Sequence, residues 1–255
     1  MNTALLKERE VMVKVRSRVS EKELAYGFSG VVTASCTGLD EALVGKRVAV
    51  ITYRGCEICE YCRAGRENLC DSKRWIRDKG EEELRIPASM VYPIPDQVSD
   101  EVAAALNFVS LAVSAVGKAK EVLGEDVLVI GDGGVSLLLV QLLKLAGAGQ
   151  VFHGPESTDC RDVKYIFDCV GETGTQKKAL ALLKQRGTLI NLVNNRTEVP
   201  IQLLDLNGEK EITSSTGSPH KDFRRALRLV ASGQLQVDTI VDRKIGWEEC
   251  MMEIG

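Results

Sequence analysis

Four cysteines within fifteen residues constrain this chain more than any other feature. They follow the spacing C-x2-C-x2-C-x7-C, at Cys56, Cys59, Cys62 and Cys70. Two thiols separated by two residues can turn toward one point, and the longer step to Cys70 lets the chain loop round and complete a tetrahedron. Zinc favours four thiolates at ~2.3 Å, and such a site is structural because it leaves no open coordination position. Ion binding can contribute on the order of 10 kcal/mol to folding a lobe that has no core of its own.

Two other interpretations of these cysteines stay open. An iron–sulfur cluster shares the C-x2-C-x2-C beginning, but its fourth cysteine follows after about three residues and precedes proline. Here seven residues intervene and Asp71 comes next. The other interpretation is that the thiols are unligated or linked by disulfides.

Composition narrows the class of protein. A DNA-binding zinc module needs a basic face, whereas this chain has 33 Lys and Arg against 36 Asp and Glu, a net charge of −3, so we expect no nucleic-acid partner. No apolar run approaches membrane-spanning length, so no membrane partner is expected. Residues 1–23 lack the apolar centre of a secretion signal. Eight cysteines, half of them in a metal-spaced cluster, predict a reducing compartment such as the cytoplasm.

The first hundred residues read as short strands separated by glycine-containing turns. Apolar and polar residues alternate over 11–17 and 83–91, and apolar runs occur at 30–33 and 47–52. These patterns predict an antiparallel barrel or sandwich, from which the cysteine loop departs after Thr52.

From Ser99 onward the pattern predicts alternating helices and strands. A long helix is expected over 100–122, a strand over 126–130 that is fully apolar after Asp126, and a helix over 137–146. Such alternation is typical of a doubly wound α/β fold with a parallel sheet. The later elements are expected as strands at 150–153, 165–169, 188–193, 211–215 and 239–245, with helices at 175–185 and 222–232.

A glycine-rich turn joins the apolar strand to the next helix. A tight turn there exposes helix N–H groups that can bind a diphosphate, so we interpret it as a cofactor loop. The pattern is G-x-G-x-x-S rather than G-x-G-x-x-G, and a turn that binds nothing is the alternative. The carboxylate of Asp132 would repel a diphosphate unless it points to solvent. The expected cofactor-binding residues are Gly131, Gly133, Gly134, Val135 and Ser136.

Together these segments resemble the medium-chain dehydrogenase/reductase family, in its zinc alcohol, sorbitol and threonine dehydrogenase branch. The similarity covers nearly the whole chain, in runs that begin at Gly45, Cys56, Val127, Phe167, Gly187 and Ala226. It implies a GroES-like antiparallel β-barrel domain over 1–98, with a zinc lobe at about 55–75, completed by 239–255. A shortened Rossmann domain is implied over 99–238.

The resemblance also implies a cofactor and an assembly. NAD or NADP would contact Gly171 and Val193 in addition to the glycine turn. Relatives commonly pair the outer Rossmann strand, here 211–215, across a two-fold axis. We therefore expect a homodimer or homotetramer.

The sequence departs from the resemblance where relatives hold a catalytic zinc. Those relatives use a Cys after the first strand, the His of a Gly-His-Glu run and a later Cys or Glu. Here Tyr26 stands at the His position, Gly27 at the Glu position, and 106–112 contains no Cys, His or Glu. A catalytic zinc needs three protein ligands, so we expect none. Tyr26 is the candidate proton donor, provided that its surroundings lower its pKa; the alternative is a packed aromatic side chain.

A second departure lies in the Rossmann half. Only ten residues separate His153 from Lys164, too few for the usual helix and outer strand. The acid that holds the adenosine ribose should fall near Pro155. Glu156 beside it is therefore a candidate cofactor contact, with an ordinary surface carboxylate as the alternative.

These features predict an NAD(P)-dependent oxidoreductase with a structural zinc, acting on a small-molecule carbonyl, alcohol or conjugated double bond. The alternative is a catalytically degraded family member that serves as a binding or assembly subunit. A thiol redox sensor built on the cysteine lobe is a third hypothesis.

Overall fold

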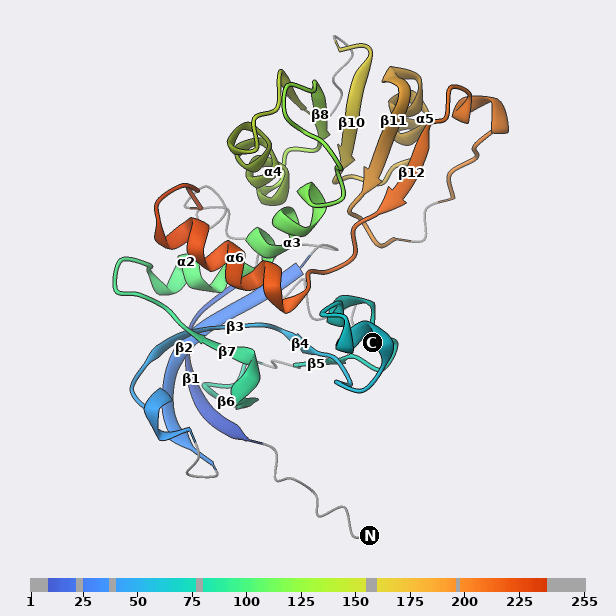
Figure 1. Cartoon of the computed structure of the whole chain (residues 1–255). Coiled ribbons are helices and arrows are strands. Elements are labelled where there is room, and N and C mark those ends of the chain that lie inside the picture. Colours follow the sequence, from blue (N-terminus) through green and yellow to red (C-terminus); the bar gives the residue numbers. More distant parts are fainter. Residues whose placement is uncertain are drawn as a thin grey trace.

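A computed structural model describes residues 9–21, 25–36, 40–76, 80–154, 160–195 and 198–237. Figure 1 shows an antiparallel sheet below and a parallel sheet above, with helices between them. The expected strand at 239–245, and the completion of the first domain by 239–255, lie outside the described residues. Among the described helices, none has both the length and the hydrophobicity needed to cross a bilayer.

The first sheet is antiparallel, as predicted, and its strands run in the order β6-β1-β2-β3-β7. Alternate residues Val11 and Val13 are fully buried, while Lys14, the next residue after Val13, is exposed. This period of two places one face of the sheet in the core. The strands are β1 (Glu10–Glu21), β2 (Ala25–Ser35), β3 (Arg47–Val50), β6 (Glu83–Pro87) and β7 (Val91–Pro93).

The second sheet is parallel, in the order β12-β11-β10-β8-β9. Val127 and Val129 of β8 face α4 (Gly134–Leu145), whereas Leu128 and Ile130 pack with α5 (Thr173–Leu182) on the other side. Helices on both faces confirm the doubly wound prediction. The strands are β8 (Val127–Ile130), β9 (Val151–Gly154), β10 (Val163–Asp168), β11 (Leu183–Asn191) and β12 (Glu211–Ser214).

The connection from β9 to β10 is short. Within the described chain no helix lies between these strands, and β9 is the outermost strand on its side of the sheet. Cys160, which is 1% exposed, packs with Leu128 and Ile130 on the α5 face. The expected loss of one outer strand and its helix therefore agrees with the described topology.

The single helix predicted over 100–122 is wrong. The structure has α2 (Asp100–Ala104) and α3 (Leu106–Val116), and α3 ends at Gly117. Beyond Gly117 the run Lys118–Glu121 is mostly exposed, and Ala119 is its one residue packed partly against the core, so packing does not sustain the helix. The chain turns instead and buries Val122.

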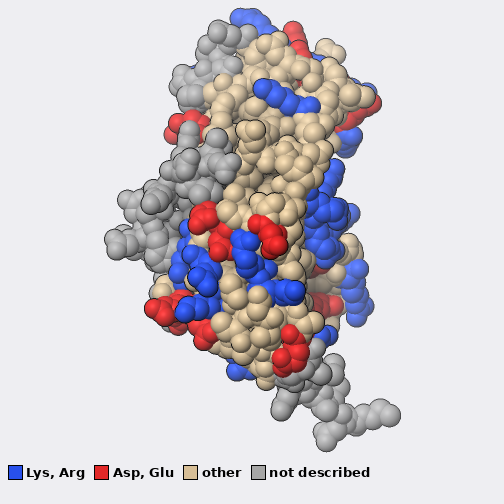
Figure 2. All heavy atoms as spheres, turned by 90° about the vertical axis from the view of Figure 1, so that its left-hand side faces the viewer, with Lys and Arg blue, Asp and Glu red and all other residues tan. Residues whose placement is uncertain are grey.

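Three helices join the two sheets. Helix α2 lies against β1, β2 and β3, while α3 packs against both α4 and α6 (His220–Ala231). Figure 2 shows basic and acidic side chains mixed over the lower part of one face and few charges over its upper part. On that face the charges therefore concentrate on the antiparallel half.

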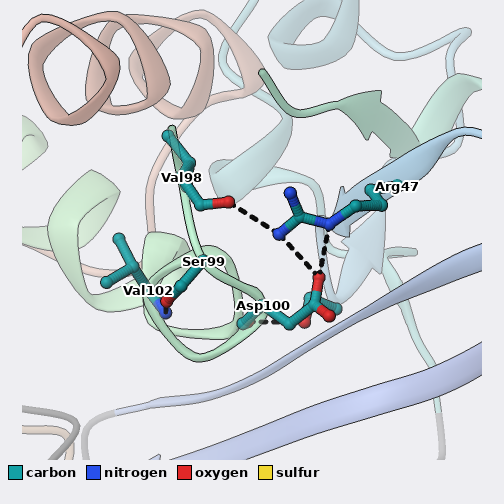
Figure 3. Close-up of polar contacts among 6 residues, drawn as sticks. Arg47, Val98, Ser99, Asp100 and Val102 are labelled. Atoms are coloured by element: carbon teal, nitrogen blue, oxygen red, sulfur yellow. Dashed lines mark hydrogen bonds and ion pairs between the residues drawn. The ribbon is translucent and has the colours of Figure 1, made fainter. Parts of the chain in front are cut away.

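Arg47 fixes the start of α2 on the antiparallel sheet (Figure 3). Its guanidinium donates to Asp100 Oδ1 at 3.0 Å and to the Val98 carbonyl at 2.6 Å. Ser29 Oγ donates to the Asp100 carbonyl at 2.6 Å, and Ser99 caps the helix by accepting from Val102 N at 3.2 Å. Because guanidinium donors lie in one plane, a single side chain can hold both acceptors.

We expect Arg47→Met to lower the free energy of unfolding by about 1–2 kcal/mol, since the pair is only partly shielded from water. Arg47→Lys should recover less than half of that loss, because an ammonium cannot reproduce the two-acceptor geometry. Urea unfolding measures both. The exposed neighbour variant Lys46→Met should stay within about 0.5 kcal/mol of wild type, and equal losses at both positions would contradict this role for Arg47.

Candidate metal centre and cofactor crevice

The four cysteine side chains converge on one point. Their sulfur atoms all lie within 4.8 Å of one another, and a zinc tetrathiolate requires separations of about 3.8 Å. Cys59 is the N-cap of the short helix α1 (Glu60–Arg63), and Cys62 lies within that helix. Cys70 follows the 3-10 turn η2 (Glu67–Leu69). The described cysteines are all free thiols, so the structure gives no support to a disulfide-linked cluster.

The surroundings of the sulfurs also suit a thiolate-bound cation. Backbone N–H groups donate to them: Cys56 N to Cys70 Sγ at 3.3 Å, and Cys59 N to Cys56 Sγ at 3.3 Å. A Cβ at Gly55 would lie 2.4 Å from Cys62 Sγ, so glycine is required for the chain to pass this close. The donor set fits a structural zinc.

The thiols of Cys56 and Cys62 differ in acidity. Hydrogen bonds from the backbone N–H groups of Ile58 and Cys59 lower the pKa of Cys56 to about 6. Burial raises the pKa of Cys62 to about 12. Cys56 therefore gives up its proton more readily than Cys62, and metal binding favours the thiolate form of each ligand.

The glycine turn lies at the carboxyl end of β8. Gly131 has φ +124°, and a Cβ there would lie 3.1 Å from the Cys169 side chain. Gly133 begins α4 without a side-chain cap, which leaves the helix N-terminus available to an anion. Buried Ser136 donates to the Gly133 carbonyl at 2.7 Å and lies 3.2 Å from His153 Nε2. Asp132 is exposed.

Two further predicted cofactor residues meet at the ends of β10 and β11. Gly171 has φ +71°, and a Cβ there would lie 3.0 Å from Val193 Cβ. Fully buried Asp168 shapes this turn by accepting from Val170 N at 2.9 Å and Gly171 N at 3.0 Å. The carboxyl ends of three adjacent strands, β8, β10 and β11, thus lie side by side, at the edge where an open α/β sheet usually binds its ligand. Asp168 was not predicted as a site residue, although it lies in the Phe-Asp-Cys-Val-Gly run that contributes to the family resemblance. The predicted cofactor contact Glu156 lies outside the described residues.

The residues at the positions that the family resemblance associates with a catalytic zinc make contacts within the protein. Tyr26 is half-buried and its hydroxyl donates to the Ile76 carbonyl. Asn107, in the stretch expected to supply a third ligand, donates to the Val50 carbonyl at 2.9 Å. A Cβ at Gly27 would lie 2.1 Å from the Ala104 oxygen. In the described part of the chain, the four cysteines form the single cluster of three or more potential metal ligands.

Comparison with known proteins agrees with this architecture. Residues 8–96 match the alcohol dehydrogenase GroES-like domain. The L-galactonate-5-dehydrogenase of Escherichia coli (strain K12) is 25% identical over 258 residues, which are 87% of this chain and 75% of that protein. The chain belongs to the medium-chain dehydrogenase/reductase family.

Two further comparisons show how far the similarity extends. An L-threonine 3-dehydrogenase of Chromobacterium violaceum is 32% identical over 132 residues, 50% of this chain but only 38% of that protein. A short chain alcohol dehydrogenase from E. coli CFT073, solved with the cofactor NADH, has 21% identity and a TM-score of 0.78, covering 90% of this chain and 82% of that one. At this sequence identity, the similarity to the E. coli CFT073 structure shows a shared fold.

We expect Gly27→Ala to lower the free energy of unfolding by about 3 kcal/mol, because the added methyl group meets a backbone oxygen that cannot move alone. Chemical denaturation measures this cost. Gly174→Ala, in α5 with open space around its Cβ position, is the matched control and should gain up to about 1 kcal/mol. A neutral Gly27→Ala would show that β2 is not held against α2 as described.

Proposed function

We propose that this chain is a nicotinamide-dependent oxidoreductase that carries a structural zinc and no catalytic zinc. The observation that carries this proposal is the uncapped N-terminus of α4 behind the Gly131–Ser136 turn, in a crevice shared with Gly171 and Val193. Its substrate would be a small molecule with a carbonyl, an alcohol or a conjugated double bond. The domain division is part of the proposal: a GroES-like domain over 1–98 and a Rossmann domain over 99–238.

The chain's own residues would hold the cofactor by its phosphates. Backbone N–H groups of Gly134, Val135 and Ser136 would donate to the diphosphate at the positive end of α4. Gly131 and Gly133 would let the backbone approach it closely, with exposed Asp132 turned to solvent. When bound, the nicotinamide supplies or accepts a hydride. Both NAD and NADP remain candidates, and Glu156 is the proposed ribose contact.

Tyr26 is the proposed proton donor, since it occupies the position at which relatives place a metal-binding His. Its hydroxyl donates to the Ile76 carbonyl, so it would have to exchange this partner for the substrate oxygen. Without a metal, stabilisation of a developing alkoxide would fall to such donors alone.

A binding or assembly subunit is the second candidate function. The observation that favours it is the packing of Gly27 and Asn107 where family members hold a catalytic metal. The two functions separate on one measurement: oxidation of NADH or NADPH in the presence of a panel of aldehydes, quinones and enones. Turnover of any member favours the enzyme, and tight nucleotide binding without turnover favours the subunit.

We also propose a homodimer paired through β12. This strand ends the parallel sheet, and an edge strand is a ready template for pairing with a second copy. Ile212 on β12 is 38% exposed, and Leu203 and Leu204 of the neighbouring turn η4 (Leu203–Leu206) are 90% and 76% exposed. Leu203 and Leu204 precede the strand in the chain, and a second copy would cover these exposed apolar side chains.

Metal analysis should find about one zinc per chain, held by the four cysteines. Cys70→Ser should lose most of that zinc and lower the melting temperature, because the lobe depends on the ion for its fold. Cys36→Ser changes an exposed cysteine outside the cluster and should leave the zinc content unchanged. A content near two, or iron in place of zinc, would contradict the proposed site.

Asp132→Asn should tighten nucleotide binding by about 2- to 5-fold at low ionic strength, because it removes a negative charge beside the proposed diphosphate site. Titration of intrinsic fluorescence with NAD, NADH, NADP and NADPH measures the affinities. Asp96→Asn removes an exposed carboxylate from the other half of the chain and serves as the control. If Asp132→Asn binds the nucleotides with wild-type affinity at about 20 mM salt, the diphosphate binds elsewhere.

The double variant Leu203→Asp, Leu204→Asp should convert the dimer to a monomer, since it places charges in the proposed apolar interface. Sedimentation velocity measures the change, and circular dichroism checks that the fold is retained. The control is Leu123→Asp, which changes an exposed apolar residue away from β12. If both proteins sediment as wild type, the interface lies elsewhere.

A further inference from the structure

The segment Ser215–His220 connects β12 to α6, and the cysteine lobe with its base strand β4 (Tyr53–Arg54) contacts it at several points. Asn68 Nδ2 donates to the Thr216 carbonyl at 2.9 Å, and the Tyr53 hydroxyl donates to the Ser218 carbonyl. His220 Nε2 lies 3.3 Å from the Tyr53 carbonyl. These partners are about 150 residues apart in the sequence, so no spacing pattern could have revealed them.

The contact surface is buried and closely fitted. Exposed fractions are 4% for Tyr53, 7% for Asn68 and 8% for Ser218. Gly217 has φ +57°, and a Cβ there would lie 3.5 Å from Asn68 Cβ. Burial raises the pKa of Tyr53, so its hydroxyl stays a neutral donor. Buried donors that lose their acceptors are costly, which makes these contacts difficult to break singly.

The lobe also supplies a cap for α6. Pro219 precedes this twelve-residue helix and offers no side-chain cap. Glu67 Oε2 lies 3.4 Å from His220 N instead, where a carboxylate interacts favourably with the helix dipole. Glu67 and Asn68 lie in η2, between Cys62 and Cys70, so coordination of the cysteines would determine where both side chains stand.

The same segment reaches the cofactor crevice from its other end. Ser215 N donates to the Asn191 carbonyl at 2.8 Å. The Asn191 side chain accepts from Val193 N at 3.0 Å and donates to the Val193 carbonyl at 3.1 Å. Val193 in turn lies against Gly171. Three consecutive contacts therefore connect the segment to two proposed cofactor-binding residues.

We propose that Tyr53, Glu67 and Asn68 are positioning residues for the nicotinamide crevice. The metal-loaded lobe clamps Ser215–His220, and the clamped segment holds Asn191 and Val193 in the geometry that receives the cofactor. Zinc loading and cofactor affinity are then coupled through side chains that touch neither ligand. This inference rests on the proposed function for its ligand, but the clamp itself is a property of the chain.

The test compares Asn68→Ala and Tyr53→Phe with wild type, using the full-length chain. Tyr53→Phe deletes one hydroxyl and keeps the ring, which lies 5.1 Å from that of Trp75. Glu60→Gln alters an exposed residue of the same lobe and is the control. Three quantities are measured for each protein: zinc content, backbone hydrogen exchange, and the dissociation constants of NADH and NADPH.

We expect both variants to keep about one zinc per chain and to bind the better nucleotide about 5- to 30-fold more weakly. Exchange should accelerate at the amides of Val193, Ser215 and His220 and stay unchanged in β8. Removing zinc from wild type with a chelator should accelerate the same amides, whereas Glu60→Gln should behave as wild type.

Each remaining outcome has one meaning. Unchanged exchange at Val193 and Ser215 in both variants overturns the clamp, whether or not nucleotide binds. Faster exchange with unaltered nucleotide affinity overturns the coupling to the crevice. Faster exchange in a protein whose wild type binds no nucleotide supports the clamp and overturns the proposed function instead.

Discussion

Residues 55–76 bury very little apolar surface of their own. In this lobe the buried residues are Gly55, Asn68 and Cys70, whereas Ile58, Tyr61 and Trp75 are exposed. Hydrophobic packing therefore cannot hold the lobe in shape, and the convergence of four sulfurs on one point is the constraint that can. Glu67 and Asn68 lie between the last two cysteines, so the orientation of the contacts to α6 depends on that same cluster.

The proposed cofactor site lies at one edge of the parallel sheet for a different physical reason. The chain bends sharply at the carboxyl ends of β8 and β10, near the end of β11. Glycine occupies the positions where a Cβ would come too close to a neighbouring side chain. The first turn of α4 adds unpaired N–H groups at the same edge. Omitting one outer strand beyond β9 leaves this arrangement intact, because the crevice lies between β8 and β10, at the point where the strand order reverses.

The antiparallel half places Gly27 and Asn107, two positions singled out by the family resemblance, in close packing contacts. Gly27 allows β2 to pack against the end of α2, and Asn107 satisfies a β3 carbonyl from the neighbouring helix. These contacts join the antiparallel sheet to α2 and α3. Stability of the junction, which Arg47 also supports, thus comes from residues that the family resemblance marks as catalytic positions.

The sequence alone determined the cysteine cluster, the two types of sheet and the glycine turn, because each follows from local spacing or periodicity. Local pattern was misleading for the helix at 100–122, where burial of Val122 and the end of α3 at Gly117 depend on packing. It was silent on Asp168, whose carboxylate shapes a turn through backbone groups. Only the tertiary structure brought Asn68 to Thr216 and Tyr53 to Ser218, since hydrogen bonds across about 150 residues leave no periodicity in a chain.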